Sequence, residues 1–307
     1  MVVRSSQEGA PGPVLASKVG SGRAVGVSLM LGSGLSTQLG AAVAALAFPV
    51  IGPVGVVAVR QWVAAVVLLG VGRPRPLSFT AAQWWPVLGL AAVFATMNLA
   101  LYTAIERIGL GLAVTLEFLG PLAVALAGSR RRTDLACAIA AGVAVVVLTR
   151  PQPSTDYLGI GLALLAAVCW GCYILLNRTV GERLPGLEGS AAAAGVSALV
   201  YLPVGGLALW HHPPTLPALA CALAAGVLSS AVPFLSDLVA LRRVPTHYFG
   251  IFMSVNPVLA ALVGVVVLDQ HLDVTSWAAV AVIVSANAVT VTTTTTTRPA
   301  GDQTHRS

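Results

Sequence analysis

Charged residues are scarce in this sequence: Asp, Glu, Lys and Arg make up 9% of its 307 residues, whereas hydrophobic residues make up 57%. A soluble domain contains roughly 25% charged residues, so this composition excludes an ordinary water-soluble fold. The hydrophobic residues form runs of about 20, the length that an α-helix needs to cross a bilayer. Because backbone groups in lipid must pair within their own segment, such runs must be helical. We therefore expect an all-α integral membrane protein that lies in the lipid bilayer.

Residues that hold disulfides, metals or cofactors are also few. The four cysteines all lie in hydrophobic runs, which excludes an extracellular disulfide framework. Cys169 and Cys172 have the C-x-x-C spacing of redox sites, but a thiol in the middle of an apolar helix lacks the charged, accessible surroundings that activate it. The five histidines have no metal-ligand spacing, and the sequence has no phosphate-binding loop and no nucleophile–base pair. We expect no catalytic residue, no metal and no cofactor.

Ten predicted spans account for nearly the whole chain. They are expected at residues 24–48, 54–72, 85–105, 109–129, 134–149, 158–178, 190–210, 217–241, 246–268 and 275–296. The polar residues 1–23 are expected to be a disordered cytoplasmic N-terminus, and residues 298–307 a cytoplasmic tail. The spans form two five-helix halves, at residues 24–150 and 156–297.

The basic residues indicate the orientation of these spans. They give a net charge of +6 but lie singly or in short groups between apolar runs, so nucleic acid is not an expected partner. Lys and Arg are enriched in cytoplasmic loops of membrane proteins. If the N-terminus is cytoplasmic, every Lys and Arg except Arg60, Arg107 and Arg150 lies on the cytoplasmic side. This pattern predicts that both termini are cytoplasmic.

The two halves resemble each other in sequence. Residues 104–128 align without a gap with residues 240–264, and the identical pairs include Arg107 with Arg243 and Pro121 with Pro257. Because each half has an odd number of spans, the second half is inverted in the membrane. Inverted repeats of this kind place a substrate site between the halves, near the middle of the bilayer. The repeat therefore points to transport.

Ionisable residues inside spans are costly and are candidates for function. Three lie there: Arg60, Glu117 and Asp237. Arg60 and Glu117 are expected at similar depth, in the same half of the membrane as the polar residues Gln38, Asn98 and Tyr102. A polar cluster that lines a cavity explains all five. The alternative is an Arg60–Glu117 ion pair that only holds two helices together. Asp237 is close to the end of its span, so an interface anchor is an equal alternative there.

Three prolines inside spans are expected to break helices. A proline cannot donate a backbone hydrogen bond to the residue four positions earlier. Pro121 therefore frees the carbonyl of Glu117, and Pro233 and Pro257 do the same for Ser229 and Met253. At Glu117 the free carbonyl and the carboxylate occupy one turn.

Two runs also resemble a known family. Residues 98–125, NLALYTAIERIGLGLAVTLEFLGPLAVA, are similar to the signature of the threonine/homoserine exporters of the EamA-type drug/metabolite transporter superfamily. Residues 228–262 resemble the second-half counterpart of that signature. The resemblance implies a ten-helix inverted-repeat fold in the cytoplasmic membrane and the export of amino acids or similar small metabolites, driven by an ion gradient. Departures occur at Asp237, at Asn256 and at Asp269-Gln270, where the family usually has glutamate, glutamate and Gly-Glu.

These observations predict a secondary exporter of amino acids, with H⁺ as the coupling ion. Glu117 would bind the substrate amine or the proton, and Arg60 would bind the substrate carboxylate or balance the charge. Export of drugs or other metabolites on the same fold is an alternative. A membrane-embedded thiol-redox enzyme and a scaffold that transports nothing are alternatives from other classes. The sequence leaves a homodimer open.

Overall fold

In the computed structural model, the described residues are 13–127, 156–233 and 255–295, with a few isolated positions between these ranges. Their regular elements are, in chain order, α1 (Pro13–Ala45), α2 (Phe48–Gly72), η1 (Pro76–Ser78), α3 (Ala81–Ile108), α4 (Leu110–Glu117), α5 (Leu119–Ala127), α7 (Tyr157–Arg183), α8 (Glu188–His211), α9 (Leu216–Gly226), η2 (Val227–Ala231), α12 (Asn256–Leu268) and α13 (Val274–Thr295). The element η1 is a 3-10 helix and η2 is a π-helix. The predicted all-α class is confirmed for this part of the chain.

Several of these helices can cross a membrane. Among the described residues, α2, α3, α7 and α8 are long and apolar enough to do so. Shorter apolar helices cover residues 110–124, 216–231, 256–268 and 274–286, and each overlaps a predicted span. The protein is therefore a multi-pass membrane protein. The predicted span 134–149, and parts of the spans 217–241 and 246–268, lie outside the described residues.

The first two helices begin earlier than the sequence predicted. The helix α1 begins at Pro13, so residues 13–23 are helical and not disordered as expected. The helix α2 begins at Phe48 and contains a kink at Gly52, whose φ of 65° is readily adopted only by glycine. Pro53 follows the kink directly, so the predicted span 54–72 corresponds to the part of α2 beyond it.

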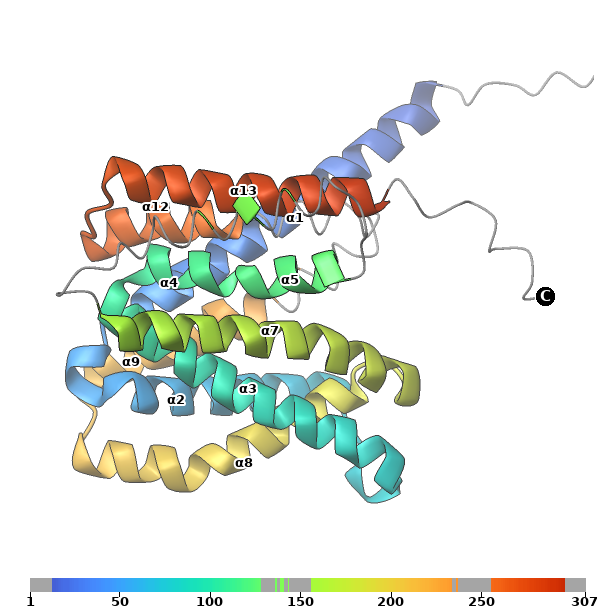
Figure 1. Ribbon diagram of the computed structural model, residues 1–307. Coiled ribbons are helices and arrows are strands. Elements are labelled where there is room, and N and C mark those ends of the chain that lie inside the picture. The colour runs from blue at the N-terminus through green and yellow to red at the C-terminus, as the bar shows by residue number, and fades with distance from the viewer. Residues whose placement is uncertain are drawn as a thin grey trace, which may run out of the picture.

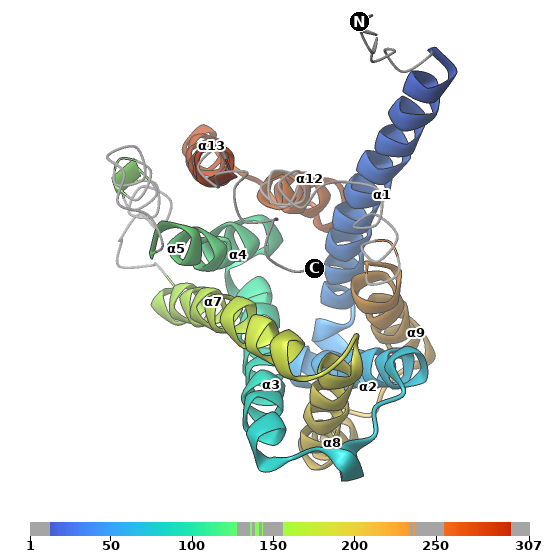
Figure 2. The same ribbon diagram turned by 90° about the vertical axis from the view of Figure 1, so that its right-hand side faces the viewer.

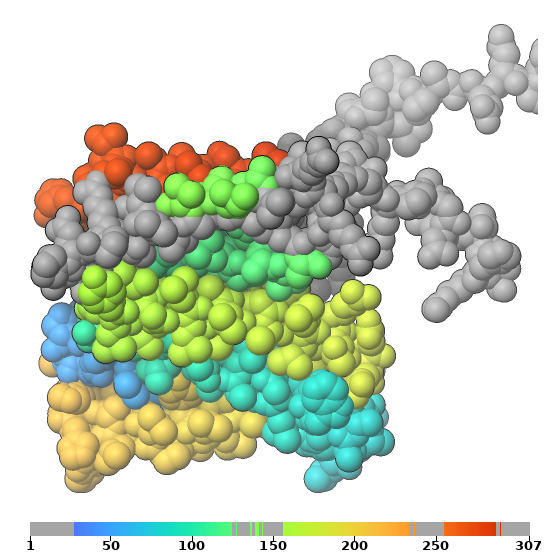
Figure 3. Space-filling model, in the orientation of Figure 1, coloured from blue at the N-terminus to red at the C-terminus, as the bar shows by residue number. Residues whose placement is uncertain are grey.

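The helices pack side by side, as the two perpendicular views show (Figures 1 and 2). The helix α3 lies along α7 and α8, and α2 lies along α8. The helix α4 lies between α7 and α12, and α1 contacts α12, α9 and η2. Figure 3 shows the face formed by α7 together with α3 and α8. On α7 and α8, large apolar side chains such as Val168 and Leu199 are exposed, as expected for a surface that faces lipid.

Small residues allow the helices to approach closely. A Cβ at Gly111 would lie 2.9 Å from the Cα of Ala261, and a Cβ at Gly120 would overlap the backbone of Ala167. These contacts bring α4 against α12 and α5 against α7. Contacts between small residues are typical of membrane helices, where van der Waals packing drives association. They fix the position of α4, which carries Glu117.

Candidate functional site

A central cavity of about 190 Å³ lies among α1, α2, α3, α4, α7, η2 and α12. It is smaller than the roughly 300–1,000 Å³ of pockets that hold drug-sized ligands, so it fits a solute of the size of an amino acid. Its polar lining residues are Ser33, Thr37, Gln38, Arg60, Tyr102, Glu117, Ser229 and Asn256. Its apolar lining residues include Leu101, Val114, Phe118 and Trp170. Both halves of the sequence therefore contribute to one cavity.

Among the described residues, the groups that contact the guanidinium of Arg60 are neutral. Its Nη1 donates a short hydrogen bond to Oδ1 of Asn98, whose own amide donates to the carbonyl of Phe94 at 2.7 Å. Its Nη2 donates to the carbonyl of Ser229 at 3.4 Å, and its Cζ lies 5.0 Å from the centre of the Tyr102 ring. The sequence placed Asn98 in the polar cluster. In the structure its side chain holds the Arg60 guanidinium by a hydrogen bond and is not among the residues that line the cavity.

The carbonyl of Ser229 that Arg60 contacts lies in η2, four residues before Pro233, which is just beyond that turn. Pro233 has no N–H with which to bond the carbonyl of Ser229, as the sequence analysis anticipated. Ser229 lies in the π-helical turn η2, and Arg60 on α2 donates a hydrogen bond to the Ser229 carbonyl. Single π-helical turns inside membrane or soluble helices are frequent at functional sites.

Glu117 is buried, and no described residue forms a hydrogen bond with its carboxylate. It is 5% exposed and is the last residue of α4. The helix is interrupted at Phe118 and resumes at Leu119, and Pro121 lies in the first turn of α5. No side chain or backbone group of the described residues forms a hydrogen bond or an ion pair with the carboxylate. Among the residues that the structure describes, no ion pair joins Arg60 to Glu117, and both residues line one cavity.

Tyr102 and Gln38 complete the predicted cluster. Tyr102 is 1% exposed, and its ring packs edge-on against Phe48, with 6.1 Å between the ring centres. Its hydroxyl has no hydrogen-bond partner among the described residues. Gln38 on α1 is 4% exposed and lines the same cavity.

Asn256 lines the same cavity. It is the first residue of α12 and faces α1, where a Cβ at Gly34 would lie 2.7 Å from its Oδ1. Pro257 lies in the first turn of α12, so within the described residues it starts a helix and does not interrupt one. Asp237 lies outside the described residues, as do Met253 and the repeat partners of Arg107 and of its neighbours.

Sequence reasoning did not identify the serine contacts between α1 and η2. The hydroxyl of Ser36 donates to the carbonyl of Leu228 at 2.8 Å, and the hydroxyl of Ser229 donates to the carbonyl of Thr37 at 3.2 Å. The spacing of Ser33, Ser36 and Thr37 places them on one face of a helix, which could have revealed a polar stripe. Nor did it identify the aromatic wall made by Phe118 and Trp170, whose ring centres are 4.6 Å apart.

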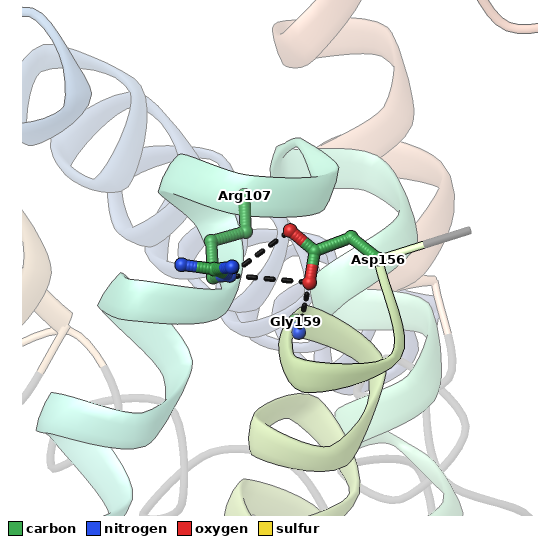
Figure 4. A network of polar contacts seen from close by, with 3 residues as sticks. All are labelled: Arg107, Asp156 and Gly159. Carbon is green, nitrogen blue, oxygen red and sulfur yellow. Dashed lines mark hydrogen bonds and ion pairs between the residues drawn. The ribbon is translucent and has the colours of Figure 1, made fainter. Parts of the chain in front are cut away.

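Outside the cavity, an ion pair joins the end of α3 to the start of α7 (Figure 4). The Nε of Arg107 lies 2.9 Å from Oδ2 of Asp156. The same carboxylate caps α7 by accepting from the backbone N–H of Gly159 at 2.8 Å. This N–H, together with the Arg107 guanidinium, holds the pKa of the Asp156 carboxyl below its ordinary value. Asp156 was not among the residues predicted from the sequence.

The C-x-x-C cysteines do not form a common site. Cys169 is buried, whereas Cys172 is exposed on the surface of α7, and both are free thiols. Within the residues that the structure describes, no group of three His, Cys, Asp or Glu side chains could hold a metal ion.

Comparisons with known proteins extend over most of the chain. The profile of the EamA-like transporter family matches residues 157–292. The threonine/homoserine exporter RhtA of Escherichia coli is 34% identical over 266 residues, which cover 84% of this chain and 88% of that protein. RhtA of Salmonella typhimurium is 35% identical over 257 residues, with coverage of 81% and 85%. A solved crystal structure shares the fold at a TM-score of 0.54 and 19% identity, covering 87% of this chain and 97% of its own.

Proposed function

This chain belongs to the EamA-like transporter family, and we propose that it exports amino acids such as threonine and homoserine, or similar small metabolites, across a membrane. Its relatives are transporters and not enzymes. The membrane proposed is the cytoplasmic membrane.

The observation that carries this proposal is a small cavity whose described lining contains one cation, Arg60, and one carboxylate, Glu117, with no ion pair between them. An amino acid is a zwitterion and needs one group of each sign. Arg60 would bind its carboxylate and Glu117 its ammonium group. Both are removed from bulk water, so electrostatic contacts there are stronger than at a surface. Because no ion pair joins the two among the described residues, both charged groups can contact the solute.

Glu117 also suits a proton-coupling role. A carboxylate in a cavity that opens alternately to the two sides of the membrane can take up a proton on one side and release it on the other. Intramembrane carboxylates are a usual component of such proton relays. The helix break at Phe118 lies next to Glu117 and allows α4 and α5 to change their relative tilt. We therefore propose H⁺ as the coupling ion.

The packing supports a ten-span fold made of two inverted five-helix repeats. The helix α7 lies against α3, α4 and α5, and α1 lies in the same manner against α9, η2 and α12. The helices α2 and α8 pack against each other, and so do α4 and α12. Exchanging each first-half helix for its second-half counterpart keeps this pattern. A transporter of this type holds its substrate at the interface of the repeats, where the cavity lies.

Reporter fusions test the ten-span topology with both termini in the cytoplasm. A fusion after residue 150 should report the outer side, and a fusion after residue 307 should report the cytoplasm. Cytoplasmic readings from both positions would contradict a division into five plus five spans.

Transport by the purified protein in proteoliposomes tests the site. We expect the wild type to exchange labelled threonine and to accumulate it in response to a pH gradient. Glu117→Gln should insert normally and lose the gradient-driven transport. Glu106→Gln is the matched control, because Glu106 is exposed at the end of α3. Gradient-driven transport by Glu117→Gln at the wild-type rate would reject the coupling role. Transport of organic cations but of no amino acid would favour the drug-export alternative.

A further inference from the structure

A second cavity, of about 380 Å³, lies between α2 and α8 and shares no residue with the central cavity. The helical part of this apolar groove is formed chiefly by Trp62, Ala65 and Leu69 of α2 and by Gly195, Leu199 and Leu202 of α8. Every residue that lines it is apolar, and the indole N–H of Trp62 is already bonded to the carbonyl of Ala198 at 3.2 Å. Leu199 and Leu202 are 63% and 54% exposed, so the groove opens at the surface of the helix bundle.

The groove runs along the helices for about the depth of one lipid leaflet. On α8 its residues extend from Ala192 to Leu202, which is about 15 Å at 1.5 Å per residue. The hydrocarbon core of a bilayer is about 30 Å thick, so each leaflet supplies about 15 Å of it. The groove starts where α2 ends at Gly72 and α8 begins, and these two ends touch, since a Cβ at Gly72 would lie 2.6 Å from that of Ala191. It therefore has the position and length of a lipid acyl chain.

Two arginines lie at the end of the groove where α2 stops. The segment that joins α2 to α3 contributes Pro74 and Pro76 to the wall, and Figure 2 shows this segment beside α8. Arg73 and Arg75 alternate with these prolines in the chain, and both arginines are exposed. Neither side chain forms a hydrogen bond or an ion pair with any residue that the structure describes. The mouth of the apolar groove therefore carries positive charge.

Other arginines at this end of the helices are held by protein groups. Arg178 bonds Glu182 at 3.1 Å, and Arg183 donates to the carbonyl of Ala82 at the start of α3. Glu188 is the first residue of α8, and within the described ranges it forms no ion pair with the arginines of the joining segment. Their charge is therefore available to an anion outside the protein.

We propose that the apolar groove binds an anionic phospholipid, with one acyl chain along α2 and α8 and the phosphate against Arg73 and Arg75. Basic pockets between membrane helices on the cytoplasmic side bind anionic headgroups, and the joining segment is cytoplasmic in the proposed topology. Trp84, at the same end of the groove, suits the headgroup level, where tryptophan is enriched. The arginines supply the selectivity, because an apolar groove alone would accept the acyl chain of any lipid. This site is independent of the solute that the protein transports.

Thermal unfolding of the purified full-length protein in detergent tests the proposal. The probes are dioleoylphosphatidylglycerol and dioleoylphosphatidylcholine, which share their acyl chains and differ in headgroup charge. The anionic lipid should raise the thermal midpoint at about tenfold lower concentration, and added salt should reduce this preference. Equal effects of the two lipids would overturn the proposal. Glycerol 3-phosphate, which has no acyl chain, should leave the midpoint unchanged, and a shift as large as that of the anionic lipid would indicate a site for a soluble phosphate instead.

Charge variants locate the headgroup. Arg73→Gln combined with Arg75→Gln should abolish the preference for the anionic lipid, and Arg75→Gln alone should reduce it. Arg178→Gln is the matched control, because it removes an exposed arginine at the end of α7, and it should keep the full preference. A preference that survives the double variant, or that Arg178→Gln removes equally, would overturn the assignment of the two arginines.

Filling variants locate the acyl chain. A Cβ at Gly195 would lie 3.4 Å from Leu69, so Gly195→Leu extends into the groove and should weaken the binding of both lipids by about tenfold. Gly206→Leu is the control on the same helix, since a Cβ there would meet nothing within 4 Å, and it should bind both lipids as the wild type does. Unchanged lipid binding by Gly195→Leu would overturn the proposal. A change from dimer to monomer in light scattering would also overturn it, because a second copy of the chain would then cover the groove. Where a variant does not fold, the comparison of the two lipids on the wild type decides the outcome.

Discussion

Arg60 on α2 and Arg107 on α3 are satisfied in different ways. The side chain of Arg107 is 38% exposed, and it pairs with Asp156 at 2.9 Å. Arg60 lies in the wall of the cavity and is contacted by the amide of Asn98, the carbonyl of Ser229 and the ring of Tyr102. None of these three groups is charged. The carboxylate of Glu117 faces the same cavity, and no described residue forms an ion pair with it.

Arg107 and Asp156 form a structural ion pair, whereas Arg60 and Glu117 are charges that a solute in the cavity can contact. An exposed ion pair contributes little to stability, because water screens it. A charge in the membrane interior is costly, and it is retained where substrate or ions use it. If Arg60 and Glu117 had been paired directly, they would have satisfied each other and left no charge for a zwitterion. The comparison therefore predicts that variants of the cavity affect transport and that variants of the exposed pair do not.

The largest expected effect is that of Arg60→Ala. Removing a desolvated charged contact costs about 2–5 kcal/mol, so threonine transport should fall by roughly a hundredfold or more. Arg107→Ala should remain within about twofold of the wild type, because its pair is exposed. Initial transport rates at matched amounts of reconstituted protein provide the measurement. Comparable losses in the two variants would break the distinction between the two arginines.

The double variant Arg60→Ala with Glu117→Ala sharpens this result. Arg60→Ala alone leaves a buried carboxylate without a nearby cation and should reduce the yield of folded protein. Removing Glu117 as well should restore the yield but not the transport. A double variant that transports at the wild-type rate would show that the two charges are structural.

A smaller effect is expected where α1 touches η2. A Cβ at Gly40 would overlap the hydroxyl of Ser229 and lie 2.9 Å from Leu228, whereas a Cβ at Gly161 on α7 would meet nothing within 4 Å. Gly40→Ala should lower the free energy of unfolding by about 1–3 kcal/mol, the usual effect of overpacking. Gly161→Ala should leave it unchanged or raise it, since alanine favours the helix. Thermal midpoints in detergent measure both, and equal midpoints would contradict the close contact at Gly40.

Asp156→Asn should have a slight effect that depends on pH. The pKa of Asp156 is lowered in the folded protein, so its ionised form stabilises the fold. This contribution is present above the ordinary range of an aspartate, near pH 4, and disappears as pH falls through the lowered value. The thermal midpoint of the variant should therefore be slightly below that of the wild type at pH 7, and the gap should close on acidification. A gap that widens at low pH would contradict the assigned direction.

The smallest effect is expected for Cys169→Ser combined with Cys172→Ser. One thiol is buried and the other exposed, so they do not face a common site. Transport should stay within about twofold of the wild type, as for other substitutions that leave the cavity intact. Loss of transport at normal expression would restore the thiol-redox interpretation.

The lengths of the apolar runs in the sequence predicted a helix well where the whole helix is apolar. The expected spans 158–178 and 190–210 correspond to α7 (Tyr157–Arg183) and α8 (Glu188–His211). They failed at α1, because hydrophobicity marks the part of a helix that lies in lipid, and a helix can continue beyond it. The expected span 54–72 also began too late, because the positive φ of Gly52 lets α2 continue through a kink.

For the site, the sequence by itself determined which polar residues are candidates, since Arg60, Glu117 and Gln38 stand out in apolar runs where polar groups are costly. Only the tertiary structure decided what each of them contacts. The carbonyl that Arg60 reaches belongs to Ser229, 169 residues away. The free hydroxyl of Tyr102 and the pairing of Arg107 with Asp156 are likewise results of packing. The physical reason is that a partner depends on the rotation of each helix and on its neighbours, and the local pattern of hydrophobic residues specifies neither.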